Sequence, residues 1–237
     1  MSCHAQTVLP RWRGFNLLEM FTTKSDCNWR EDDFRWISDW GFDFVRLPLC
    51  YLLWTKGNDP YALHEPGLEA VDRAVDLGRR YGLHVCLNFH RAPGYSVNRE
   101  REEPFNLWKD DDALDAFRFH WRTFAERYRG IPATELSFNL VNEPGSPSDE
   151  LMTRTDHERV MRATVATIRD VDPERLIILD GLAWGNEPCP ELADLAGLGV
   201  AQSCRAYVPM GVSHYKASWV GGENWPEPRW PGRMNDG

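Results

Sequence analysis

Residues 136–144 read LSFNLVNEP, an apolar run over 136–141 that is followed at once by Asn142, Glu143 and Pro144. A short, nearly continuous apolar run is typical of a strand buried in a parallel sheet. Proline has no N–H to donate to a sheet ladder, so Pro144 turns the chain away from the strand. The stretch therefore predicts a buried strand that ends on an amide and a carboxylate.

The same kind of apolar run recurs five times along the chain. The other runs are 14–21 (GFNLLEMF), 42–49 (FDFVRLPL), 83–89 (LHVCLNF), 176–179 (LIIL) and 200–207 (VAQSCRAY). Segments with helical spacing of apolar residues lie between them, at 29–40, 68–81, 111–128, 150–170 and 190–198. Regular alternation of strand and helix predicts right-handed crossovers and a parallel sheet.

Two architectures fit this alternation, an open doubly wound sheet and a (β/α)8 barrel. The phosphate-binding motifs G-x-G-x-x-G and G-x-x-x-x-G-K-[ST], which favour the open sheet, are absent from the sequence. Polar side chains instead follow most of the strands, namely Asn16, Glu19, Arg46, His90, Asn142, Glu143 and Tyr207. In a barrel these strand ends converge on one mouth. We therefore predict an α/β protein of the (β/α)8 TIM-barrel class, with about six of the eight units present.

Charge and composition limit the partners and the location. The 27 Lys and Arg against 36 Asp and Glu leave a net charge of −9, which argues against nucleic acid and anionic membrane surfaces as partners. No apolar run is long enough for a membrane-spanning helix, and the first residues lack the apolar core of a signal peptide. We expect a cytoplasmic protein, or a secreted one if the true start lies upstream. The oligomeric state stays open.

The cysteine pattern predicts neither disulfides nor a metal site. None of the six cysteines forms a C-x-x-C pair, and no Cys/His spacing resembles a zinc site. No H-x-H motif supplies ligands for a metal-dependent barrel hydrolase. We therefore expect reduced thiols and no metal or other cofactor.

Four motifs in fixed order resemble glycoside hydrolase family 5, a family of retaining barrel glycosidases. They are RGFN at 13–16, FVRLPL at 44–49, NFHRAPGY at 88–95 and LVNEP at 140–144. The segment 207–219, YVPMGVSHYKASW, is similar to the family's strand-six region. The resemblance covers nearly the whole chain and implies a single glycoside hydrolase catalytic domain over residues 1–237.

The resemblance also implies roles for individual residues. Glu143 matches the acid/base, and Asn142 matches the neighbour that binds a sugar hydroxyl. Arg46 would position the nucleophile, and His90 would line the sugar site beside the scissile bond. Two further residues lie in the strand-six region: Tyr207 would hydrogen-bond the nucleophile, and His214 would lie near the mouth. Trp184, just after the fifth strand, is our candidate for stacking on a sugar ring.

The nucleophile is missing from the predicted strands. In the family a second glutamate ends strand seven, and a retaining glycosidase needs its two carboxylates about 5–5.5 Å apart. We expect that glutamate beyond residue 237, in which case the chain is a C-terminally incomplete domain with negligible activity alone. The alternatives are that Glu187 or Glu223 takes the role, or that the chain binds carbohydrate without cleaving it. A second N-E-P, at 186–188, lies several residues past its strand and indicates a loop. A β-glucan or β-glucoside is the expected substrate, with β-mannan as the alternative.

Overall fold

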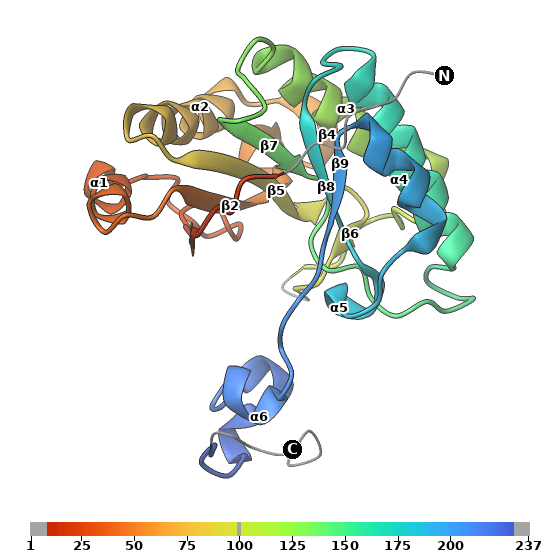
Figure 1. Ribbon diagram of the computed structural model, residues 1–237. Helices are drawn as coiled ribbons and strands as arrows, with labels where there is room; N and C mark the ends of the chain where they lie inside the picture. Colours follow the sequence, from red (N-terminus) through yellow and green to blue (C-terminus); the bar gives the residue numbers. More distant parts are fainter. Residues whose placement is uncertain (1–8, 99–100, 230–237) are drawn as a thin grey trace. The chain divides into compact units, whose positions relative to one another are not determined.

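The computed structural model describes residues 9–98 and 101–229. The chain divides into two compact units, Met1–Ser203 and Cys204–Gly237, which are described separately below (Figure 1). The first unit holds all the strands of the main sheet. The prediction of one catalytic domain over residues 1–237 stays a prediction.

The main sheet contains six parallel strands that pair in chain order. A short seventh strand pairs with one of these six. In spatial order the six are β1 (Gly14–Asn16), β2 (Phe44–Cys50), β5 (His84–Ala92), β7 (Leu136–Asn139), β8 (Leu176–Asp180) and β9 (Val200–Ser203). The seventh, β6 (Tyr95–Ser96), turns back antiparallel on β5. A doubly wound sheet reverses its strand order at a switch point, whereas a barrel sheet does not. The unbroken order therefore confirms the predicted barrel-type sheet with six of eight strands. A separate hairpin, β3 (Thr55–Lys56) and β4 (Asp59–Leu63), follows β2 and was not predicted.

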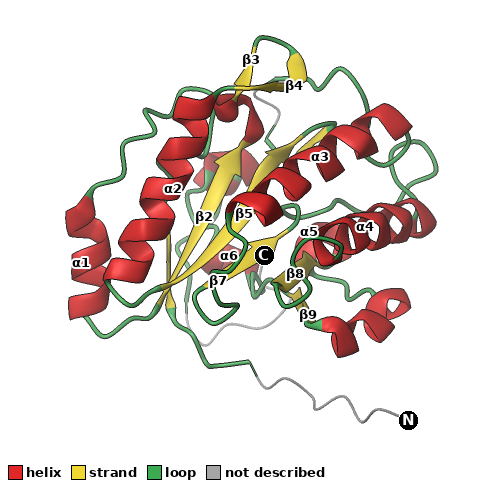
Figure 2. Cartoon of the chain, turned by 90° about the horizontal axis from the view of Figure 1, so that it is seen from above, coloured by secondary structure: helices red, strands yellow, loops and turns green. Residues whose placement is uncertain are grey.

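The helices connect successive strands and cover the sheet along its outer side (Figure 2). They are α1 (Glu31–Asp39), α2 (Glu65–Arg80), α3 (Asp111–Arg127) and α4 (Arg154–Arg169). Short 3-10 segments are η1 (Tyr51–Trp54) after β2 and η2 (Pro190–Leu198) before β9; the latter was predicted as an ordinary helix. In the structure, α4 begins four residues later than the helix predicted at 150–170, because Thr153 caps it. The Thr153 side chain accepts from the Asp156 N–H, and the Asp156 carboxylate accepts from the Thr153 N–H.

The two faces of the sheet differ in chemistry. Along β5, Val85 and Leu87 are fully buried on the face under the helices, while Cys86 and Asn88 alternate onto the other face. Cys86 pairs in register with Ser137, and Asn88 with Asn139, on the neighbouring strand β7. The helix α2 lies so close that a Cβ at Gly78 would be 2.2 Å from Val85 Cγ2. The pleat of β5 therefore places Cys86 and Asn88 on the face that would form the interior of the predicted barrel.

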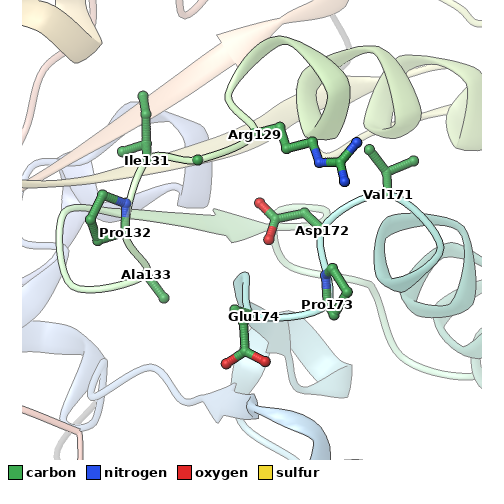
Figure 3. A pocket seen from close by; sticks show the side chains of 9 residues that line it. Arg129, Ile131, Pro132, Ala133, Val171, Asp172, Pro173 and Glu174 are labelled. Carbon is green, nitrogen blue, oxygen red and sulfur yellow. The ribbon is translucent and has the colours of Figure 1, made fainter.

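The amino end of the sheet is closed by a buried ion pair. Arg175, 1% exposed, donates to the Asp172 carboxylate from Nε at 3.1 Å and from Nη2 at 2.8 Å. The same guanidinium donates to the carbonyl oxygens of Tyr128, Ile131 and Leu136. Burial lowers the pKa of Arg175, and the charge of Asp172 opposes that shift. Beside this pair, the turns at 129–133 and 171–174 line a surface hollow (Figure 3).

The second unit contains short helical turns, namely α6 (Met210–Ser213), η3 (Ser218–Val220) and η4 (Gly222–Asn224). The predicted strand at 200–207 is too long, because β9 ends at Ser203. Tyr207 therefore does not end a strand and belongs to the second unit. No helix within the described ranges has the length and apolar character to cross a bilayer.

Candidate active site

A hydrogen-bond network joins β2 to the carboxyl end of β7. Arg46 was predicted at the end of its strand but is the third of the seven residues of β2, which continues to Cys50. Arg46, on β2, donates to Asn139 Oδ1 from Nε at 3.1 Å and from Nη2 at 2.9 Å. Its Nη2 also donates to Asn142 Oδ1 at 2.8 Å. Asn139 and Asn142 are each 2% exposed, so the half-buried arginine finds its polar partners inside the protein. The structure therefore brings the predicted residues Arg46 and Asn142 together.

Asp180, the last residue of β8, holds the backbone of Glu143. Asp180 Oδ2 accepts from the Glu143 N–H at 3.0 Å, and Oδ1 accepts from Asn139 Nδ2 at 2.8 Å and from Ser203 Oγ at 2.5 Å. Glu143 has a φ of 50°, a left-handed conformation that costs a non-glycine residue about 1–2 kcal/mol. Such a conformation persists only where its surroundings hold it, and strained residues concentrate at functional sites.

A second group holds Glu143 from the side of β5. The Tyr95 hydroxyl donates to the Glu143 carbonyl oxygen at 2.6 Å. Burial, followed by the carboxylates of Glu143 and Asp180, raises the pKa of Tyr95. The N–H and the C=O of Glu143 are thus both bonded to side chains, while its own side chain stays half-buried.

His90 lies on the extension of β5 beyond its predicted end at residue 89. The strand continues to Ala92, and the His90 ring, 9% exposed, lies 4.4 Å from the ring of Phe21. The Asn142 N–H donates to the carbonyl of the adjacent Phe89 at 3.0 Å. His90 and Asn142 therefore belong to the same end of the sheet.

The loop that follows His90 is anchored by a buried ion pair. Arg91 Nη1 contacts Glu103 Oε1 at 2.5 Å, with the two side chains 2% and 8% exposed. Glu103 Oε2 accepts from the Tyr51 hydroxyl at 2.9 Å and from the Gly94 N–H at 3.3 Å. Burial, followed by the charge of Glu103, raises the pKa of Tyr51.

Trp184 lies on α5 (Leu182–Gly185), directly after β8, and is 48% exposed. The backbone N–H of Trp184 donates to the Pro144 carbonyl at 2.8 Å, and the backbone N–H of Ala183 donates to the Gly145 carbonyl at 3.1 Å. Trp184 has a φ of 58°, so the backbone here is also left-handed. The backbone that carries the exposed indole is therefore bonded to the loop that follows Glu143.

Glu187 and Glu223 were the alternative candidates for the nucleophile. Glu187 pairs with Arg154 Nη2 at 2.7 Å on an exposed loop, as the offset of the second N-E-P predicted. Glu223 lies on η4 of the second unit. Tyr207 and His214 also belong to that unit, where their rings lie 4.7 Å apart and Ser213 Oγ donates to the Tyr207 carbonyl. Their proximity to Glu143 stays a prediction.

Other strand-end residues complete this edge of the sheet. Asn16 lies in register with Arg46 at the end of β1, where it is exposed. Burial raises the pKa of Glu19, three residues further on.

Sequence reasoning missed Asp180, Asn139 and Tyr95. A signal for Asp180 was present, because the run LIIL is followed directly by a carboxylate, just as LSFNLV is followed by Asn142 and Glu143. The predicted strand stopped one residue short of it. Tyr95 was quoted as part of a motif, but its contact with residue 143 depends on a distant pairing of chain segments.

Comparisons with known proteins agree with the predicted family and fold. Residues 4–203 match the family described as Cellulase (glycosyl hydrolase family 5). Endoglucanase C of Acetivibrio thermocellus is 28% identical over 190 residues, which cover 80% of this chain and 53% of that protein. The crystal structure of a glycoside hydrolase is 39% identical, with a TM-score of 0.85, over 93% of this chain and 67% of that one.

A further solved structure, Thermotoga maritima Cel5A in complex with mannotriose substrate, has a TM-score of 0.73 at 23% identity, covering 95% of this chain and 70% of that one. At that identity the likeness concerns the fold alone. The chain thus spans about half the length of endoglucanase C, and the family match ends at the last residue of the first unit. With four-fifths of its residues matched by one family, this chain belongs to the cellulases of glycosyl hydrolase family 5.

Proposed function

We propose that this chain carries the acid/base half of a retaining glycosidase site, with Glu143 as the acid/base. One observation carries the proposal: Glu143, four residues after the end of β7, is held in a left-handed conformation by Asp180 and Tyr95. Strain that neighbouring groups maintain at a strand end is a mark of a functional residue. The family membership supports the same role.

The chemistry follows from the neighbours. Glu143 would protonate the leaving glycosidic oxygen and later activate water. Asn142, oriented by its bond to Arg46, would bind the sugar hydroxyl next to the scissile carbon. His90 would line the same subsite, and Trp184 would present its exposed indole face to a sugar ring.

The nucleophile requires a second carboxylate about 5–5.5 Å from the acid/base. Asp180 is 1% exposed and already accepts three hydrogen bonds, and Glu187 is paired with Arg154. We therefore assign the nucleophile to a glutamate beyond residue 237, with Tyr207 hydrogen-bonded to it and His214 near the mouth.

A β-glucan or β-glucoside is the substrate that we propose, because endoglucanase C is among the relatives. A β-mannan is the second candidate, because a structural relative was solved with mannotriose.

The test is an assay of the purified chain on an aryl β-glucoside, soluble β-glucan and β-mannan, alone and fused to the seventh and eighth strand segment of a family relative. We expect negligible turnover by the chain alone and turnover by the fusion. In the fusion, Glu143→Gln should lower turnover by about 10²–10⁴-fold. Glu187→Gln and Glu223→Gln are the matched controls and should leave it unchanged.

Sugar binding is measured separately, by titration of cello-oligosaccharides into the chain. Affinity should fall in Trp184→Ala and persist in Glu143→Gln. Turnover by the unmodified chain that Glu187→Gln or Glu223→Gln abolishes would place the nucleophile within these residues. Binding without turnover in the fusion would favour a carbohydrate-binding protein, and turnover that survives Glu143→Gln would rule out the acid/base assignment.

A further inference from the structure

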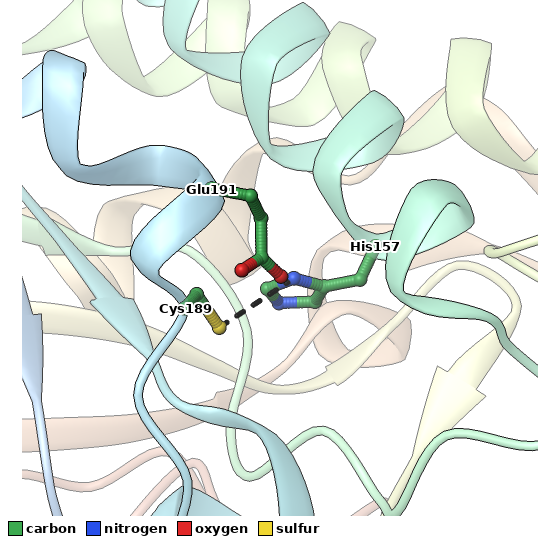
Figure 4. A group of neighbouring side chains, drawn as sticks. All are labelled: His157, Cys189 and Glu191. Atoms are coloured by element: carbon green, nitrogen blue, oxygen red, sulfur yellow. Dashed lines mark hydrogen bonds between the residues drawn. The ribbon is translucent and has the colours of Figure 1, made fainter.

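Three potential metal ligands meet between α4 and the segment that follows β8. His157 lies in the first turns of α4, and Cys189 and Glu191 lie at the start of η2. Cys189 Sγ is 3.9 Å from His157 Nδ1, and one ligand atom from each of the three residues lies within 4.8 Å of the others (Figure 4). The sequence spacings gave no hint of this group, because 32 residues separate the histidine from the cysteine.

The separations suit a small cation. Ligands bound tetrahedrally at about 2.0–2.3 Å from zinc lie about 3.5 Å apart. The three atoms here need shifts of only about 1 Å to reach that separation. His157 Nε2 has no hydrogen-bond partner among the described residues, so a small rotation of the ring breaks no bond at that nitrogen.

The backbone of Cys189 is held firmly in place. Its N–H donates to Gln202 Oε1 at 2.9 Å, and Gln202 Nε2 donates to its carbonyl at 2.8 Å. The preceding loop is closed by reciprocal backbone bonds of 2.9 Å between Leu182 and Glu187. Ligands on rigid, hydrogen-bonded elements lose little entropy on binding, so the site is largely preorganised.

The three potential ligands differ in burial, and the most exposed of them has a charged neighbour. His157 and Cys189 are fully buried, while the Glu191 side chain is 21% exposed and leaves a route from solvent. Arg154 Nη1 lies 3.2 Å from Glu191 Oε1 and 3.5 Å from Oε2. Its positive charge weakens attraction of a cation to the carboxylate.

We propose that His157, Cys189 and Glu191 bind one divalent cation of the zinc class, with the fourth position left to water. A thiolate, an imidazole and a carboxylate together suit Zn²⁺ and Co²⁺, whereas Mg²⁺ and Ca²⁺ prefer oxygen ligands alone. The cation would join α4 to the segment after β8 that also carries Trp184. None of its three ligands takes part in the chemistry proposed for Glu143.

The test uses the full 237-residue chain with Zn²⁺, Co²⁺, Mg²⁺ and Ca²⁺ as the probes. Calorimetry should show one equivalent of Zn²⁺ bound through these ligands and no comparable binding of Mg²⁺ or Ca²⁺. Co²⁺ should give a thiolate charge-transfer absorption, and Zn²⁺ should raise the melting temperature. Cys189→Ser should abolish the Co²⁺ band, while Cys204→Ser, which alters an exposed thiol, should retain it.

Two substitutions near the surface keep the test decisive if Cys189→Ser fails to fold. Glu191→Gln should weaken Zn²⁺ binding about tenfold or more, because it removes a charged ligand. Arg154→Gln should strengthen binding, because it removes the neighbouring positive charge. The proposal is overturned if no Co²⁺–thiolate band forms, if Cys189→Ser keeps the band, or if Glu191→Gln binds Zn²⁺ as tightly as the unmodified chain.

Discussion

Arg175 at the amino end of the parallel sheet and Arg46 beside its carboxyl end are both hydrogen-bonded within the protein, but to different kinds of partner. At the amino end, Arg175 bonds to a carboxylate and to three backbone carbonyls and is 1% exposed. Near the carboxyl end, half-buried Arg46 bonds to two asparagine side chains beside Glu143. In barrels the amino end serves stability and the carboxyl end serves chemistry. The difference between the partners therefore predicts different consequences of losing each arginine.

The largest expected effect is on stability at the amino end. Arg175→Met should lower the free energy of unfolding by about 3–5 kcal/mol, because it leaves the Asp172 charge buried without its partner. Arg46→Met should cost about 1–3 kcal/mol, the range for unsatisfied neutral polar groups, and should weaken sugar binding. Urea unfolding followed by circular dichroism measures both.

The matched control is Arg30→Met, which removes an exposed pair with Asp33 and should change stability by about 0.5 kcal/mol or less. Equal destabilisation by Arg46→Met and Arg175→Met would contradict the contrast between the two ends.

The next effect is a loss of stability in acid, which also arises at the amino end. His84 begins β5, with Nδ1 3.0 Å from the Thr134 carbonyl and Nε2 2.8 Å from Ser137 Oγ. Burial lowers its pKa from 6.5 to about 4. Above pH 6.5 both the folded and the unfolded forms are neutral, so the contribution of His84 is constant. As the pH falls from 6.5 to about 4, the unfolded chain gains the proton first, so stability decreases by up to about 3 kcal/mol.

His120, whose pKa burial lowers to about 3, adds to the same acid slope. The measurement is the free energy of unfolding between pH 4 and pH 7. His84→Gln should make the slope shallower by the share of one histidine. A slope that the substitution leaves unchanged would mean that His84 does not titrate on unfolding.

The smallest of the three effects concerns the carboxyl end. Asp180→Asn should cost about 2 kcal/mol, because hydrogen bonds to a charged group are lost and one amide N–H must face another donor. Hydrogen exchange at the Glu143 N–H should become faster, since that group donates to Asp180. Ser203→Ala removes a single donor to the same carboxylate and should have a smaller effect on exchange. Unchanged exchange in Asp180→Asn would show that Tyr95 alone holds Glu143.

Local sequence was sufficient for the elements and for part of the site. The apolar runs located the starts of all six parallel strands to within two residues, although the runs at 14–21 and 200–207 extend five and four residues past β1 and β9. The four strands between them are largely buried, and a buried strand is apolar at nearly every position. Asn142 and Glu143 were identified because parallel strand ends meet at one edge, although β7 ends at Asn139, two residues before the predicted end. The first residues of helices were predicted less accurately than the strands. Several residues near the start of α4 can cap a helix, and the sequence did not single out Thr153.

The sequence by itself thus determined the order of the elements, the parallel sheet, and the grouping of Asn142 with Arg46 beside Glu143. Only the tertiary structure decided which groups hold them. Asp180 and Tyr95 reach Glu143 across 37 and 48 residues of chain, and Cys189 reaches His157 across 32. Periodicity reports only the neighbours of a residue along its own strand or helix. Contacts between distant segments depend on strand register and loop closure, which become fixed when the whole sheet and its helices pack together.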